Sequence, residues 1–129
     1  MKKEQRLQVY RKYDGHCAYC GLAIKYEEMQ VDHIHSKYRG RCDKSTKEEL
    51  DCLDNYNPAC RMCNFRKGVL TIEQFRDEIY AQADREMKRF QARMSEAYGL
   101  IAYYPNYDVK FISRNENVNI RTEQEHGEM

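Results

Sequence analysis

Two pairs of cysteines have the spacing of metal ligands. Cys17 precedes Cys20, and Cys60 precedes Cys63, with two residues inside each pair. A two-residue spacer lets both sulfurs reach one ion at about 2.3 Å, and two such pairs complete a tetrahedron. A site of this kind is structural, because no coordination position remains open for water. The spacing therefore predicts a structural zinc ion held by all four sulfurs.

The cellular compartment supports metal rather than disulfides. The chain has six cysteines, and its basic start is not followed by the apolar stretch of a secretory signal. We therefore expect a cytoplasmic, reducing location, where closely spaced cysteines more often hold metal. Disulfides or unrelated thiols are the alternative. Cys42 and Cys52 lack pair spacing, so we expect free thiols there, with a mutual disulfide or a second metal as lesser alternatives.

Between the cysteine pairs lies the dipeptide Asp32-His33, preceded by residues that favour a strand. A carboxylate beside a histidine is usually an ordinary surface pair. Its position between two zinc-binding turns makes a catalytic role worth testing, because an imidazole can take a proton from water at neutral pH. Adjacent residues on a strand point to opposite faces. We therefore expect a bend if Asp32 and His33 are to serve one site.

The order of these groups resembles the HNH endonucleases, whose fold is the ββα-metal finger. Asp32-His33 matches the pair that ends the first strand, and Asn55 precedes the second cysteine pair as the family pattern requires. Asn64 follows the last cysteine, and Lys67 stands three residues further on. The third family position is thus asparagine rather than histidine, a variant also found in phage Holliday-junction-resolving relatives. An amide oxygen is a harder and weaker ligand than imidazole.

The resemblance, which covers about residues 10–67, implies a mechanism. His33 would be the general base that activates water, and Asn55 would fix the His33 loop through side-chain hydrogen bonds. Asp32 and Asn64 would offer oxygens to a catalytic Mg²⁺ or Mn²⁺. The implied activity is hydrolysis of phosphodiester bonds in DNA, by nicking or by cutting both strands.

Basic residues near the motifs predict contacts with DNA. Net charge is only +1, so overall charge does not indicate nucleic acid. Arg61, Arg66 and Lys67 fall on a short predicted helix, where they could bind phosphate without reading bases. His35 is a further candidate contact. Ordinary solvated charge and an exposed histidine are the alternatives.

The predicted fold class is α+β, a ββα-metal core stapled by zinc, with a C-terminal extension. The 129 residues suit one domain, and no apolar run reaches the roughly 20 residues that cross a membrane. We predict a nuclease core over 1–70, an extension packed on it over 71–114, and a polar tail over 115–129. Within the core we predict a helix, a strand, an exposed loop, a second strand or extended turn, and a short helix, over 3–13, 29–34, 36–52, 53–59 and 60–67.

The predicted extension begins at a capping box, Thr71 to Gln74. Apolar residues recur every three or four positions over 72–98, which predicts one long helix or two helices broken near 81–84. Segments 100–104 and 109–112 flank a Pro-Asn turn and predict a β-hairpin. The chain would act as a monomer or as a homodimer joined through 72–98.

Two functions agree with the sequence. One is a metal-dependent HNH endonuclease, and the other is a non-catalytic zinc-binding module that docks on nucleic acid or protein. Asp32, His33 and Asn64 favour the nuclease, because a mere zinc module needs no general base beside an open metal position.

Overall fold

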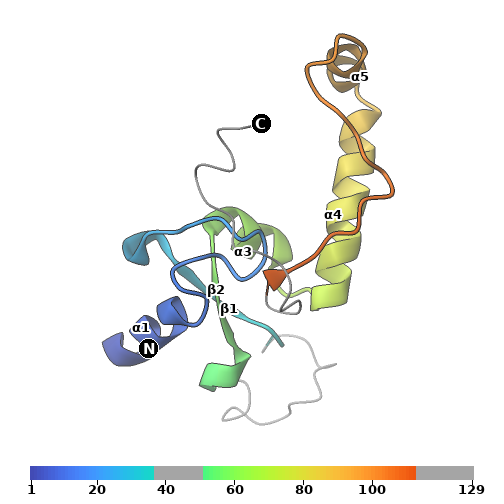
Figure 1. Cartoon of the computed structure of the whole chain (residues 1–129). Helices are drawn as coiled ribbons and strands as arrows, with labels where there is room; N and C mark the ends of the chain where they lie inside the picture. Colours follow the sequence, from blue (N-terminus) through green and yellow to red (C-terminus); the bar gives the residue numbers. More distant parts are fainter. Residues whose placement is uncertain (37–50, 113–129) are drawn as a thin grey trace. The chain divides into compact units, whose positions relative to one another are not determined.

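The computed structural model describes residues 1–36 and 51–112. Contacts divide the chain into two compact units, one running to Thr71 and resuming at Lys110, the other from Ile72 to Val109 (Figure 1). Most of the predicted 36–52 loop and all of the predicted 115–129 tail, with Cys42, lie outside the described residues. No described helix is long and apolar enough to cross a membrane.

The first unit has the predicted ββα order. Strands β1 (Gln30–His33) and β2 (Tyr56–Ala59) pair antiparallel and are followed by helix α3 (Arg61–Lys67). The register sets Asp32 opposite Asn57 and His33 opposite Tyr56. Each element is shorter than predicted, but the α+β class is confirmed. The remaining elements of the unit are helix α1 (Lys3–Arg11) and the 3-10 helices η1 (Tyr26–Glu28) and η2 (Leu53–Asn55).

A tight loop before β1 forms the first cysteine turn. Gly15 has a φ of 78°, and a Cβ added there would stand 2.9 Å from the Tyr10 hydroxyl oxygen. The position therefore requires glycine. The loop is tied to β2 because the Ala18 N–H donates to the Pro58 carbonyl at 2.8 Å. That bond brings the first cysteine pair beside the strand that leads into the second.

Helix α1 covers the strand pair with a small apolar core. Val9, Met29 and Tyr56 are buried together, and Ile24 and Val31 pack against them. The Arg6 guanidinium donates to the carbonyls of two residues of the η1 turn, Tyr26 and Met29, each at 2.8 Å. Arg6 of α1 thus holds the loop that leads into β1.

The second unit is helical. Helices α4 (Ile72–Met87) and α5 (Phe90–Ala97) are separated at Lys88-Arg89, so the break predicted near 81–84 was misplaced. Arg89 has extended backbone, with φ −76° and ψ 146°. Helix α4 starts directly after Thr71, where the capping-box pattern places its first residue.

The hairpin predicted over 100–112 does not form. The segment has a turn at its Pro-Asn dipeptide but no strand pairing within the described chain. Instead the Tyr80 hydroxyl donates to the Tyr107 carbonyl and accepts from the Val109 N–H, each at 2.8 Å. The Arg76 Nε donates to the Val109 carbonyl at 3.0 Å. Side chains of α4 therefore satisfy backbone groups that a second strand would otherwise pair with. That the whole extension packs on the core stays a prediction.

Candidate metal centre and active site

The four predicted zinc ligands come together in the first unit. Their Sγ atoms all lie within 4.8 Å of one another. Cys60 caps helix α3, where its sulfur accepts from the Cys63 N–H at 3.4 Å, and Cys20 Sγ lies 3.8 Å from Cys60 Sγ. All four are free thiols, so the disulfide alternative is not what the structure has.

The sulfurs act on one another electrostatically. Hydrogen bonds from Cys20, Cys60 and Cys63 lower the pKa of Cys17, and this outweighs its burial. The hydrogen bond with Cys17 raises the pKa of Cys60, but those with Cys20 and Cys63 together outweigh it and lower this pKa to about 7. Zinc binds the thiolate form. Hydrogen bonds with Cys17 and Cys60 raise the pKa values of Cys20 and Cys63, so the four thiols do not ionise independently. The donor set and its grouping therefore fit a structural zinc ion.

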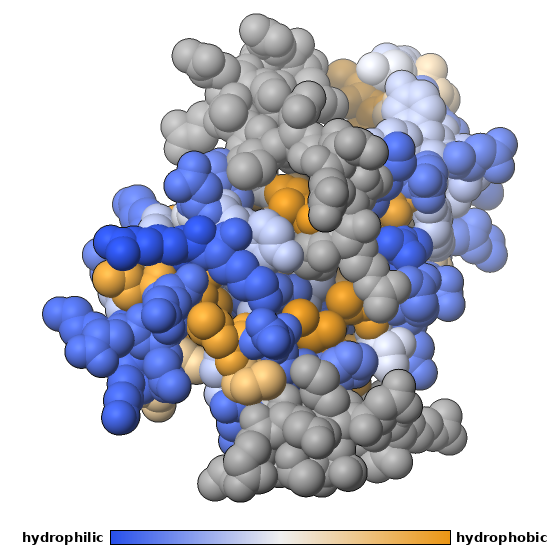
Figure 2. All heavy atoms as spheres, turned by 60° about the horizontal axis from the view of Figure 1, so that its bottom comes forward, coloured by the Kyte–Doolittle hydropathy of each residue, from blue (hydrophilic) through white to orange (hydrophobic). Residues whose placement is uncertain are grey.

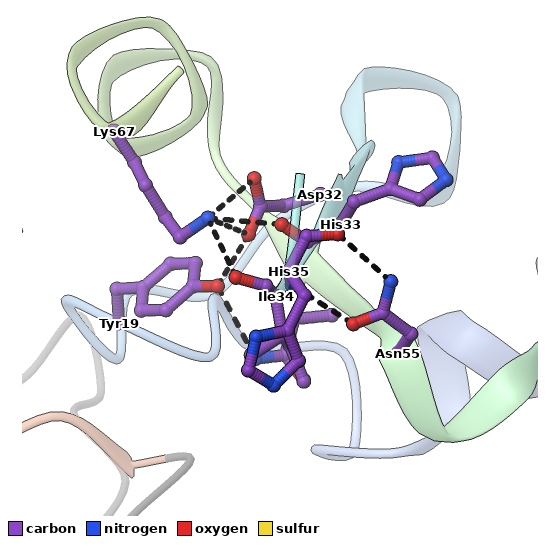
Figure 3. A network of polar contacts seen from close by, with 8 residues as sticks. Tyr19, Asp32, His33, Ile34, His35, Asn55 and Lys67 are labelled. Atoms are coloured by element: carbon purple, nitrogen blue, oxygen red, sulfur yellow. Dashed lines mark hydrogen bonds and ion pairs between the residues drawn. The ribbon is translucent and has the colours of Figure 1, made fainter. Parts of the chain in front are cut away.

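A second cluster, of polar side chains, surrounds Asp32, and the carboxylate charge is already paired with an ammonium (Figure 3). The Asp32 side chain is 3% exposed, and the Lys67 side chain is 0% exposed. Lys67 Nζ lies 3.0 Å from Asp32 Oδ2 and 3.3 Å from Oδ1. The Tyr19 hydroxyl donates to Oδ2 at 2.5 Å and accepts from Asn57 Nδ2 at 3.3 Å. Both carboxylate oxygens are therefore engaged.

Lys67 also holds the backbone at the end of β1. Its Nζ donates to the His33 carbonyl at 2.9 Å and is 3.4 Å from the Ile34 carbonyl oxygen. The predicted contact of Lys67 with DNA phosphate is therefore wrong. The last turn of α3 faces the sheet, and a lysine buried there must pair with a carboxylate and with carbonyl oxygens.

The predicted open ligand position at Asp32 is not present in this structure. Burial raises the pKa of Asp32, although the Lys67 ammonium and the Tyr19 hydroxyl counter it. A divalent cation could reach this carboxylate only by displacing an ammonium that already has several partners. Asp32 as the structure stands does not fit the predicted Mg²⁺ or Mn²⁺ site.

His33 points to the other side of β1 (Figure 3). The strand is regular through His33, so the bend expected between Asp32 and His33 is absent, and the two side chains serve different faces. The His33 ring packs edge-on against Tyr56, with centroids 5.1 Å apart. Its Nε2 lies 3.1 Å from Asp51 Oδ1, and its side chain is 28% exposed.

Asn55 closes the turn that follows His33. It is fully buried, its Oδ1 accepts from the His35 N–H at 2.9 Å, and its Nδ2 donates to the His35 carbonyl at 3.0 Å. Its own carbonyl accepts from the Ile34 N–H at 2.9 Å. These are the side-chain bonds to the His33 loop that the resemblance implied for Asn55.

The other predicted site residues lie around α3 and the His33 loop. Asn64 is half-buried, one helical turn before Lys67, and its side chain has no hydrogen bond to any described residue. Arg61 and Arg66 are exposed on α3, where contact with phosphate is sterically open. His35 is half-buried. On the face shown in Figure 2, hydrophilic residues predominate in the coloured part, and apolar residues lie among them across the middle.

Sequence reasoning missed three residues of this region. Tyr19 lies inside the first cysteine pair, and Asn57 stands two residues after Asn55 in the stretch before the second pair. Asp51 belongs to a polar stretch without a clear period, so no pattern distinguished it from its acidic neighbours. The register of β1 with β2, which sets Asp32 opposite Asn57, is the signal that points to Asn57.

Comparison with known families bears out the resemblance. Residues 17–69 match the family model described as HNH endonuclease. The segment holds all four clustered cysteines, both strands and α3. The comparisons with curated proteins and with solved structures found no match. The match and the cysteine cluster together fit a zinc-stapled ββα core.

Proposed function

We propose that the HNH segment, residues 17–69, hydrolyses phosphodiester bonds in DNA with His33 as the general base. The proposal rests on the family match over a segment that contains His33. The His33 side chain is partly exposed, with Asp51 beside its ring and Asn55 bonded to the backbone that follows it. An HNH match suggests a nuclease, and DNA as the substrate is our inference. One site per chain favours nicking by a monomer.

In the proposed reaction each described residue has a limited task. His33 takes a proton from the attacking water, Asn55 holds the loop behind it, and Lys67 fixes its carbonyl. Arg61 and Arg66 contact phosphates from the exposed side of α3. Proton removal makes the water oxygen nucleophilic toward phosphorus. As the new P–O bond forms, the bond from phosphorus to the leaving oxygen breaks on the opposite side, and that oxygen takes a proton from solvent water.

Two metals belong to the proposal, with different support. Zinc at the four cysteines would staple the fold. A Mg²⁺ or Mn²⁺ ion, when bound, would stabilise charge on the scissile phosphate and its leaving oxygen. Asn64 offers one oxygen for it, and Asp32 offers another only after Lys67 releases that carboxylate. We therefore assign no step to this ion.

The test is relaxation of supercoiled plasmid in Mn²⁺, with and without EDTA, by wild type and His33→Ala. We expect activity in the wild type that EDTA abolishes and a loss of at least about a hundredfold in the variant. Zinc content and melting temperature of the variant should match the wild type, because His33 is partly exposed and outside the apolar core. Equal nicking by both proteins would refute His33 as the base.

One observation favours the alternative, a zinc module that binds DNA without cutting it. The engaged state of Asp32 offers no ready site for a catalytic ion. A module of this kind would shift DNA in a gel in EDTA and leave plasmid intact in every divalent cation. Nicking that co-purifies with the wild type and disappears in His33→Ala would exclude it.

A further inference from the structure

The His33 ring has a fixed partner that the motif does not contain. Asp51 Oδ1 lies 3.1 Å from His33 Nε2, and the two side chains are only 22% and 28% exposed. Asp51 stands just before η2, the short helix that ends in Asn55. One segment therefore holds His33 twice, through its ring by Asp51 and through the following backbone by Asn55.

The chemistry of the pair assigns the ring protons. An ionised carboxylate only accepts hydrogen bonds, so the nitrogen that faces it must carry a hydrogen. In a neutral imidazole the other nitrogen then holds the lone pair. Nε2 faces Asp51, so Nδ1 is the basic atom. The edge-on contact with Tyr56 restricts rotation of the His33 ring about its Cβ–Cγ bond.

We propose that Asp51 is the positioning residue of the general base: it holds His33 in the Nε2–H tautomer and leaves Nδ1 to take the proton from water. The tautomer is inferred from the contact between His33 Nε2 and Asp51 Oδ1, and only the role of Nδ1 rests on the proposed function. Asp51 itself touches no reacting atom in this scheme.

The first test is the ring nitrogen spectrum of the zinc-loaded full chain at mildly alkaline pH. Two-dimensional ¹⁵N correlation, with His33→Gln used for assignment, distinguishes a protonated from an unprotonated ring nitrogen. We expect protonated Nε2 and bare Nδ1 in the wild type and a mixture of tautomers in Asp51→Ala. The matched control is Asp54→Ala, which removes an exposed acid three residues away and should leave the spectrum unchanged.

The second test is steady-state cleavage of DNA by the same variants. Asp51→Ala should lower kcat by about ten- to a hundredfold with little change in KM, because orientation of the base matters in the transition state. Asp51→Asn keeps an acceptor oxygen without the charge, so it should recover part of the loss. Asp54→Ala should behave as wild type.

Several outcomes would overturn the assignment. A wild-type ring protonated on Nδ1, or one whose tautomer Asp51→Ala does not alter, would remove Asp51 from this role. Full kcat of Asp51→Ala at saturating Mn²⁺, with a raised Mn²⁺ requirement, would make it a metal ligand instead. Absence of nuclease activity in the wild type would defeat the proposed function, while the tautomer comparison would still decide whether Asp51 orients the ring.

Discussion

The four cysteines and Asp32 were all predicted as metal ligands, and their surroundings in the structure differ in what balances the ligand charge. Four sulfurs lie within 4.8 Å of one another and act on each other's pKa values. Asp32 instead has an ammonium 3.0 Å away and a phenolic hydroxyl on the same oxygen. One group of ligands has a place for an added cation, whereas the other already contains a cation of its own.

The difference shows that ligand types alone do not define a metal site. Like-charged ligands held together disfavour one another until a cation joins them. A carboxylate buried with a lysine has its desolvation offset by the ion pair and its hydrogen bonds, and removal of one partner exposes the full cost. Three experiments probe this contrast.

The largest effect should come from the cysteine cluster. Cys60→Ser removes a ligand, and zinc binding supplies folding free energy comparable with the whole stability of a domain, roughly 5–15 kcal/mol. We expect the variant to lack zinc and to unfold or aggregate, as judged by elemental analysis and circular dichroism. Cys52→Ser, at a half-buried thiol outside the cluster, is the control and should keep wild-type zinc and melting. A zinc-free Cys60→Ser protein with normal melting would refute the staple.

A smaller loss is expected from breaking the ion pair. Lys67→Met leaves the Asp32 carboxylate buried without its cation, which should destabilise the first unit by about 3–5 kcal/mol in urea unfolding of the zinc-loaded protein. The double variant Asp32→Asn/Lys67→Met should recover much of this, because neither charge remains. Lys25→Met, at an exposed lysine of the same unit, should change stability by less than about 0.5 kcal/mol. Wild-type stability of Lys67→Met would mean that the pair does not contribute in solution.

The smallest effect concerns competition between Lys67 and a divalent ion. If the ammonium fills the place of a cation, millimolar Mn²⁺ should hardly alter the melting temperature of the wild type. In Lys67→Ala the carboxylate is released, so the same Mn²⁺ should stabilise by about 1 kcal/mol, a few degrees. Calorimetry of both proteins, each zinc-loaded, measures the shift. A larger shift in the wild type than in the variant would show that Asp32 binds the ion despite Lys67.

The order of the helices and strands could be predicted from the sequence more reliably than the contacts between distant segments. The ββα order and the cysteine pairs depend on local spacing and turn residues, and both appear in the structure. The predicted hairpin over 100–112 does not form, because side chains of α4, 27 and 33 positions away, bond backbone groups that a second strand would pair with. Helix α4 continues through the break predicted near 81–84 and ends at Met87. Residues 81–84 contain no glycine or proline that would interrupt a helix.

By itself, the sequence determined that the four cysteines form two ligand pairs, because a two-residue spacer keeps each pair within a single turn of backbone. The resemblance to HNH endonucleases further implied that His33 would end a strand and that Asn55 would bond the loop after it. Only the tertiary structure decided that Lys67 turns inward to Asp32, 35 positions away, and that Asp51 meets the His33 ring from 18 positions away. The physical reason is that the partner of a charged side chain depends on which distant segments pack beside it. Local sequence patterns do not contain that information.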